Sequence, residues 1–178
     1  MAKLAPLTFR IAKLWGAPQG TVENHDIDQK ISYPGENLDF ATNFVAKLML
    51  IRLKEELCAI ISDATISINM VCPLCLKAFV QAIKIESAER EFLHDAPKKV
   101  EDPSDLYLIN KKMMTIDLAE MVRQEIILHF PLVSVCSKSC KGLCMHCGAD
   151  CNKKKCACKA GDSETHQPFK DLRRIMNN

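Results

Sequence analysis

Hydrophobic and polar residues alternate along two segments near the middle of the chain. Apolar side chains occupy the even positions of residues 64–70, and Thr, Ser and Asn separate them. A second alternation runs over residues 79–85. A period of two is the pattern of a β-strand that buries one face. Because Cys72 and Cys75 lie between the two segments, the pattern predicts a β-hairpin with this cysteine pair at its turn.

The flanking segments give other signals. Residues 44–61 are densely apolar, but their periodicity fits a strand or a helix equally. Residues 86–105 are charged and contain two prolines, which predicts a solvated surface loop. A helix is expected near residues 117–130, with Asp117 as its N-cap and Pro131 beyond its end. Its buried face is expected to hold Leu118, Met121, Val122 and Ile126, with Glu120 and Glu125 at the surface.

Helix-breaking residues are frequent before residue 41, so residues 1–40 are expected to form an irregular N-terminal arm. Residues 41–132 are expected to form a β-rich core of antiparallel hairpins or a meander, with barrel-like closure as one alternative. Residues 133–178 are expected to form a Cys-rich lobe with a short C-terminal tail. The predicted fold class is therefore α+β, with a β-rich core, a packing helix and a Cys-rich C-terminal lobe.

Cysteine is concentrated in the C-terminal part of the chain. Seven of the ten cysteines are Cys136, Cys140, Cys144, Cys147, Cys151, Cys156 and Cys158. Two thiolates separated by two residues can bind one tetrahedral metal ion from a tight turn, and a second pair completes the site. Hydrophobic residues are sparse in this segment, so metal binding has to order it. The spacing predicts a lobe that binds zinc (Zn2+) as its cofactor.

Disulfides are the alternative explanation of ten cysteines. The N-terminal residues lack the apolar run of a secretory signal, and no apolar segment reaches the roughly 18 residues of a membrane helix. A reducing cytoplasm is therefore the expected compartment, and no membrane association is expected. In that compartment, clustered cysteines favour metal binding over disulfides.

Acidic and basic residues nearly balance over the whole chain, with 24 Lys plus Arg against 22 Asp plus Glu. The Cys-rich segment differs, because residues 136–160 contain six lysines and a single acid, Asp150. These lysines would offset the negative charge of four thiolates around one divalent ion. They would also suit contacts with RNA phosphates. The candidate RNA-binding residues are Lys138, Lys141, Lys153, Lys154 and Lys155.

Several motifs between residues 64 and 175 are shared with a known family. They are the run 115–128, Pro131, Lys141-Gly142-Leu143-Cys144, Cys147-Gly148, Asn152, Cys156-Ala157-Cys158 and, upstream, Cys72-Pro73-Leu74-Cys75-Leu76. With these residues the chain resembles the YceD family, proteins named for large ribosomal RNA subunit accumulation. The resemblance implies a cytoplasmic or organellar protein required for normal levels of large-subunit ribosomal RNA. Met145 and Cys151 depart from the family pattern, which makes Cys151 a doubtful ligand.

The geometry of cysteine turns assigns eight of the other thiols to two metal sites. The first assignment groups Cys144, Cys147, Cys156 and Cys158. The second groups Cys72, Cys75, Cys136 and Cys140, and arrangements that mix the two sets in one site stay open. Cys58 is expected to be a small buried hydrophobic residue, and His146 is expected to face solvent.

Sites made of four cysteines are closed and structural, whereas a metal hydrolase keeps one coordination position open. The chain has no Gly-rich phosphate loop and no nucleophile motif, so we expect neither an enzyme nor a small-molecule substrate. The leading hypothesis is a zinc-binding ribosome biogenesis factor whose partners are ribosomal RNA or large-subunit assembly proteins. Two alternatives are a zinc-stabilised protein-interaction adaptor and a thiol redox switch.

Overall fold

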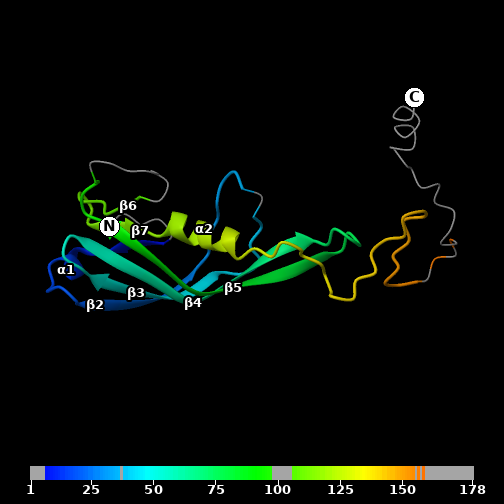
Figure 1. Cartoon of the computed structure of the whole chain (residues 1–178), viewed down its shortest axis with the longest axis horizontal. Coiled ribbons are helices and arrows are strands. Elements are labelled where there is room, and N and C mark those ends of the chain that lie inside the picture. The colour runs from blue at the N-terminus through cyan, green and yellow to red at the C-terminus, as the bar shows by residue number, and fades with distance from the viewer. Residues whose placement is uncertain (1–6, 37, 98–105, 155, 157, 159–178) are drawn as a thin grey trace, which may run out of the picture.

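The computed structural model describes residues 7–36, 38–97, 106–154, 156 and 158. Its largest element is a five-stranded sheet with the strand order β2-β3-β4-β5-β6. The strands are β2 (Val22–Gln29), β3 (Phe44–Arg52), β4 (Glu56–Val71), β5 (Ala78–Leu93) and β6 (Tyr107–Leu108). Neighbouring strands are antiparallel except for β5 and β6, which are parallel. β4 and β5 form the predicted hairpin, whose turn extends beyond the rest of the sheet (Figure 1).

Two short strands and two helices complete the described fold. β1 (Thr8–Arg10) pairs with β7 (Thr115–Asp117) in a separate two-stranded sheet, and α1 (Ala12–Trp15) follows β1. α2 (Ala119–Leu128) begins after β7 and lies across one face of the five-stranded sheet (Figure 1). It confirms the helix expected near residues 117–130, but the N-cap is Leu118 and not Asp117, which is the last residue of β7. Among the described residues, no helix combines the length and the apolar character needed to cross a membrane.

The hydrophobic core lies between α2 and the sheet. The helix buries Leu118, Met121, Val122 and Ile126, as predicted from their spacing. These side chains belong to one apolar cluster with Phe44 of β3, Ile66 of β4 and Phe92 of β5. Glu125 differs from the prediction, because it is buried and forms an ion pair with Arg90 of β5 at 2.9 Å. A cationic partner on the sheet is what allows this carboxylate to lie inside.

The β4–β5 hairpin is longer than the sequence pattern predicted. We expected residues 86–105 to be a surface loop, but β5 continues to Leu93, and residues 98–105 lie outside the described part of the chain. The buried positions of β5 are odd-numbered up to Ile85 and even-numbered from Ala88. β4 changes phase as well, near Asp63, whose φ is 52° and where the register with β3 is irregular. An alternation that changes phase looks interrupted in the sequence although the strand is continuous.

Two further expectations about the fold are wrong. The described part of residues 1–40 is not an irregular arm, because β1 lies there and β2 is an edge strand of the main sheet. β2 has the burial pattern of an edge, with Ile27 buried and charged or polar residues around it, so its apolar signal is weak. The barrel-like alternative is also wrong, because within the described residues β2 and β6 are the two edges of an open sheet.

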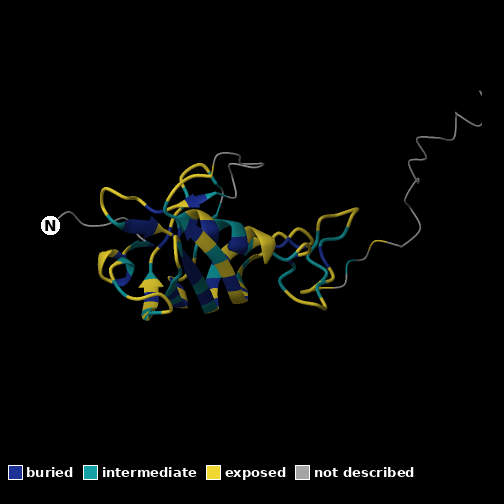
Figure 2. Cartoon of the chain, turned by 60° about the vertical axis from the view of Figure 1, so that its left-hand side comes forward, coloured by how far each residue is buried: buried dark blue, intermediate teal, exposed yellow. Residues whose placement is uncertain are grey.

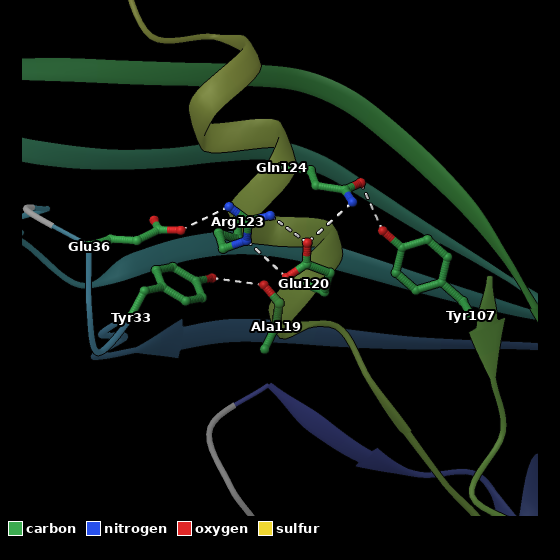
Figure 3. Close-up of polar contacts among 7 residues, drawn as sticks. All are labelled: Tyr33, Glu36, Tyr107, Ala119, Glu120, Arg123 and Gln124. Carbon is green, nitrogen blue, oxygen red and sulfur yellow. Dashed lines mark hydrogen bonds and ion pairs between the residues drawn. The ribbon is translucent and has the colours of Figure 1, made fainter. Parts of the chain in front are cut away.

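Polar contacts hold the first turns of α2 in place (Figure 3). Arg123 donates hydrogen bonds to Glu36 at 2.8 Å and to Glu120 at 2.6 Å. The hydroxyl group of Tyr33 donates to the carbonyl oxygen of Ala119 at 2.9 Å. The loop after β2 is therefore tied to the helix. Because the chain runs from α2 toward the hairpin turn, this position of the helix also directs the cysteines that follow it (Figure 1).

Candidate metal centres

Four cysteines meet at the turn of the β4–β5 hairpin. This first quartet consists of Cys72, Cys75, Cys136 and Cys140. The hairpin turn supplies two of them, and the segment that follows α2 brings the other two to it. The Sγ atoms of Cys75 and Cys136 lie 3.5 Å apart, and those of Cys72 and Cys140 lie 3.9 Å apart. A hydrogen bond of 2.8 Å from the N–H of Leu76 to the carbonyl oxygen of Cys72 closes the turn.

The second quartet is formed by residues that are close in sequence. It consists of Cys144, Cys147, Cys156 and Cys158. The N–H of Gly148 donates to the carbonyl oxygen of Cys144 at 2.9 Å, and Gly148 has φ 69°, a conformation that glycine adopts without strain. In each quartet the four Sγ atoms all lie within 4.8 Å of one another. Each quartet could therefore hold one metal ion.

The electrostatics of the quartets favour a cation at their centres. The backbone N–H of Cys136 lowers the pKa of Cys72 to about 6. Hydrogen bonding within the quartet, first with Cys75, raises the pKa of Cys136 to about 12. The second quartet shows the same pKa shifts. Backbone N–H groups lower the pKa of Cys144 to about 6, and hydrogen bonding with the Cys147 thiol raises the pKa of Cys158 to about 12. Four thiolates in so small a volume repel one another, and a metal ion that binds sulfur removes that repulsion.

Backbone contacts join the two quartets. The N–H of Leu143 donates to the carbonyl oxygen of Leu74 at 2.9 Å, which connects the start of the second quartet to the hairpin turn. Gly142 has φ 71°, and a Cβ at this position would lie 3.0 Å from the same oxygen. Asn152 accepts a hydrogen bond from the N–H of Lys141 at 2.8 Å. The lobe is held by such contacts rather than by an apolar core, and Figure 2 shows its described residues as mostly intermediate or exposed.

The structure groups the predicted ligands into two separate sets of four, and these are the two sets that the turn geometry assigned. Cys58 lies apart in β4, where it is buried as expected, and this burial raises its pKa to about 12. Cys151 belongs to neither set, and its Sγ lies 3.6 Å from the carbonyl oxygen of Ala149. His146 is exposed, as predicted.

Two of the candidate RNA-binding lysines, Lys141 and Lys153, line a cleft of about 790 Å³ beside the first quartet. Lys77 and Phe79 line the same cleft, although no motif in the sequence marked them as candidates. Their signal was their position directly after the hairpin turn, which makes them neighbours of the metal ligands once the hairpin forms. The cleft therefore combines residues that directly follow the hairpin turn with residues of the Cys-rich lobe.

The other candidate lysines have different positions. Lys138 and Lys154 are exposed and are not among the residues that line this cleft. Lys155 lies outside the described residues. The structure thus separates the predicted lysines into those that share one concave surface and those that do not, a distinction that the sequence alone does not contain.

Comparison with known families gives a match over residues 62–175 to the family described as Large ribosomal RNA subunit accumulation protein YceD. The match covers more than half of the chain. It begins within β4 and includes the hairpin turn, α2 and both quartets. The cleft beside the first quartet lies in the same segment.

Two curated plant proteins are similar to parts of the chain, and both are described as "Large ribosomal RNA subunit accumulation protein YCED homolog 1, chloroplastic". The protein from Arabidopsis thaliana is 34% identical over 62 residues, which are 34% of this chain and 19% of the relative. The protein from Zea mays is 39% identical over 58 residues, which are 32% of this chain and 20% of the relative. The matched segment spans about a fifth of each relative. No solved structure matches the chain significantly.

Proposed function

The chain belongs to the YceD family, and on this premise we propose that it is a zinc-binding, non-catalytic ribosome biogenesis factor. It supports the accumulation or processing of large-subunit ribosomal RNA, the process named in the descriptions of the family and of both plant relatives. Its partners are ribosomal RNA or proteins that assemble the large subunit. One observation carries the proposal: the family-matched segment builds two all-cysteine quartets in a lysine-rich lobe.

Zinc is the metal that fits this donor set best. Four thiolates complete the tetrahedral coordination of zinc at Zn–S distances of about 2.3 Å. Sites of this kind cross-link a fold rather than catalyse a reaction. The cysteines of the first quartet would hold the hairpin turn against the segment after α2. With four sulfur ligands at each site, no coordination position is left for a substrate, which supports the non-catalytic role.

The charge of the lobe supports a polyanionic partner. Four thiolates around a divalent ion carry a formal charge of about −2, so two such sites carry about −4. The positive charge of the six lysines in residues 136–160 is larger than the combined negative charge of the two metal sites and Asp150. Lys77 adds a further positive charge beside the first quartet. The lysines can therefore compensate the metal sites and still pair with RNA phosphates.

The proposal can be tested in the organism that encodes the chain. Depletion of the protein is expected to lower the ratio of large-subunit to small-subunit ribosomal RNA, and the tagged protein is expected to co-sediment with large-subunit precursors. Elemental analysis of the purified, reduced protein is expected to find one zinc ion for each quartet. An unchanged RNA ratio after depletion would contradict the role, and the absence of zinc would contradict the metal assignment.

A protein-interaction adaptor is the second candidate function. The apolar side chains Val71, Leu74, Leu76 and Val80 surround the hairpin turn and are 49% to 65% exposed. Groups of exposed apolar residues are typical of surfaces that contact another protein. Salt distinguishes the two candidates, because phosphate contacts weaken steeply as the salt concentration rises, whereas apolar contacts do not.

Two other hypotheses stay predictions. The first is the cytoplasmic location, because both similar plant proteins are described as chloroplastic. The second is the thiol redox switch, in which oxidation of cysteines would release the metal ion. The reactivity of individual cysteines in the zinc-loaded protein tests this switch, since a closed zinc site protects its thiolates.

A further inference from the structure

The cleft beside the first quartet has a lining that the metal sites alone do not require. It is formed by the start of β5, the segment that begins at Cys136, and residues between 141 and 153. Its hydrogen-bond donors include Lys77, Lys141, Lys153, Ser137 and Ser139. Ammonium and hydroxyl groups at one concave surface suit an anion, because they supply both positive charge and hydrogen bonds.

Asp150 also lines the cleft, but its charge is engaged within the protein. Its Oδ1 accepts hydrogen bonds from the backbone N–H and the side-chain amide of Asn152, both at 2.9 Å. Its Oδ2 lies 3.9 Å from Nζ of Lys153. Three lysines thus face one carboxylate, and this excess of two positive charges offsets the formal charge of about −2 of the zinc-loaded first quartet, whose Cys75 and Cys136 also line the cleft. An anion would therefore be held by direct contact with the ammonium and hydroxyl groups and not by a net positive charge of the cleft.

Phe79 gives the cleft an aromatic wall. It lies on the face of β5 that buries Ile83 and Ile85, but it is only half-buried itself. The reason is that α2 ends at Leu128, while the hairpin continues beyond the end of the helix (Figure 1). The core face of the hairpin thus becomes an open surface beside the lysines. Aromatic rings next to cationic groups are the surfaces on which bases of single-stranded nucleic acids stack.

We propose that this cleft binds a single-stranded segment of RNA, with a phosphate group between the three lysines and a base stacked on Phe79. The inference rests on the RNA-binding role proposed above and assigns that role to particular residues. The cleft volume of about 790 Å³ is in the range of sites that enclose small ligands. A duplex keeps its bases stacked and offers no free base to the ring. An acidic peptide would pair with the lysines but leave the ring without a stacking partner.

The test is the binding of a labelled oligouridylate to the full zinc-loaded chain, measured by fluorescence anisotropy at several salt concentrations. Lys77→Ala, Lys141→Ala and Lys153→Ala are each expected to weaken binding. Each should also reduce the slope of log K against log salt by about 0.7, the value for one phosphate contact with a single strand. Lys138→Ala and Lys154→Ala are the matched controls, because these exposed lysines of the same lobe do not line the cleft. These control variants are expected to change the slope by less than half as much as the three cleft-lysine variants do.

Substitution of the ring separates stacking from charge. Phe79→Leu is expected to weaken binding about ten-fold at every salt concentration without changing the slope, as for the loss of one base stack. Phe79→Tyr keeps a stacking surface and is expected to bind like the unchanged chain. Val80→Ala is the control for a smaller side chain near the turn, because Val80 lies on the opposite face of β5. The zinc content of each variant shows whether its lobe has formed.

The outcomes distinguish this cleft from RNA binding in general. Equal losses of RNA affinity in the cleft-lysine and control-lysine variants, with no effect of Phe79→Leu, would contradict RNA binding in this cleft. Such a result would still be consistent with RNA binding elsewhere on the lobe. If the unchanged chain binds neither the oligouridylate nor large-subunit ribosomal RNA, both proposals fail. Stronger binding of a duplex, or of an acidic peptide of equal charge, would also overturn the assignment to single-stranded RNA.

Discussion

The backbone N–H of Leu143 donates a hydrogen bond of 2.9 Å to the carbonyl oxygen of Leu74. Leu74 lies between the two cysteines of the hairpin turn, and Leu143 directly precedes Cys144. This contact therefore places the first residue of the second quartet against the turn of the first quartet. Gly142 allows the close approach, because a Cβ at this position would lie 3.0 Å from the same oxygen.

Gly142→Ala is expected to loosen this contact. Gly142 has φ 71°, a conformation that costs an L-residue about 1–2 kcal/mol. The added methyl group would also press on the backbone oxygen of Leu74, which cannot shift unless the hairpin turn moves. The midpoint of thermal unfolding of the zinc-loaded protein is expected to fall, and zinc is expected to pass to a competing chelator faster. Calorimetry and chelator competition measure these two effects.

Gly148→Ala is the matched control for this substitution. Gly148 has a similar φ of 69°, but apart from its chain neighbours no atom of the described residues lies within 4 Å of the position of its Cβ. It therefore carries the conformational cost without the steric contact. The difference between the two variants isolates the contact with Leu74, and equal destabilisation by both would contradict its role.

The local parts of the metal centres were predictable from the sequence. Two cysteines separated by two residues can reach one ion only from a tight turn, so the spacing limited the possible groupings. The alternation on either side of Cys72 and Cys75 predicted the hairpin, because each strand buries one face over that part of its length. Both signals depend on residues that are close in sequence.

Features that depend on distant residues or on weak patterns were not predictable in this way. β2 was missed because an edge strand that buries Ile27 among polar residues carries little apolar signal. The second half of β5 was missed because its buried positions change phase between Ile85 and Ala88. The cleft was missed because Lys77 and Lys153 are far apart in sequence and come together only when the lobe folds back onto the hairpin turn.

Loss of one cysteine pair is expected to remove one zinc ion and to leave the other. The double variant Cys144→Ser with Cys147→Ser disrupts the second quartet, while the first quartet keeps all of its thiols. The far-ultraviolet circular dichroism of the sheet is expected to persist, because the apolar core lies between α2 and the strands and not in the lobe. Elemental analysis and circular dichroism of the same sample check both expectations.

The reciprocal double variant, Cys72→Ser with Cys75→Ser, is expected to lose the other ion. Cys151→Ser is the control that should keep both ions, because Cys151 belongs to neither quartet. Full zinc content in either double variant would contradict the ligand sets. Loss of all zinc from both double variants would contradict two independent sites.

Arg123→Ala is expected to lower the free energy of unfolding slightly, because Arg123 pairs with Glu36 and Glu120 at a partly exposed surface. The effect depends on pH through Glu120. Hydrogen bonding to Arg123 lowers the pKa of Glu120 below its ordinary value of 4.5. This stabilisation is therefore present above the ordinary pKa and is lost as the pH falls through the lower pKa of the folded state.

Urea unfolding at neutral pH and at about pH 3 measures this dependence, with the fluorescence of Trp15 as the signal from the core. Arg10→Ala, at an exposed position of β1, is the control that also accounts for the effect of acid on the metal sites. The difference between the unchanged chain and Arg123→Ala is expected to shrink at the lower pH. A difference that stays constant would contradict the contribution of Glu120.

The two cysteines outside the quartets are expected to differ in their reaction with iodoacetamide. Cys151 is half-buried, and its Sγ lies 3.6 Å from the carbonyl oxygen of Ala149. Cys58 is buried in β4, where burial raises its pKa to about 12 and its Sγ donates to a carboxylate oxygen of Glu89 at 3.1 Å. Because the thiolate is the reactive form, the raised pKa keeps Cys58 protonated and unreactive at neutral pH.

Peptide mapping during alkylation of the zinc-loaded protein is therefore expected to find Cys151 modified first and Cys58 modified only after unfolding. The cysteines of both quartets are expected to react once a chelator has removed the metal, because metal binding protects their thiolates. Cys151→Ser should abolish the early adduct. Early adducts on quartet cysteines, accompanied by the release of zinc, would instead favour the thiol switch, because an open site exposes nucleophilic thiolates to oxidants at neutral pH.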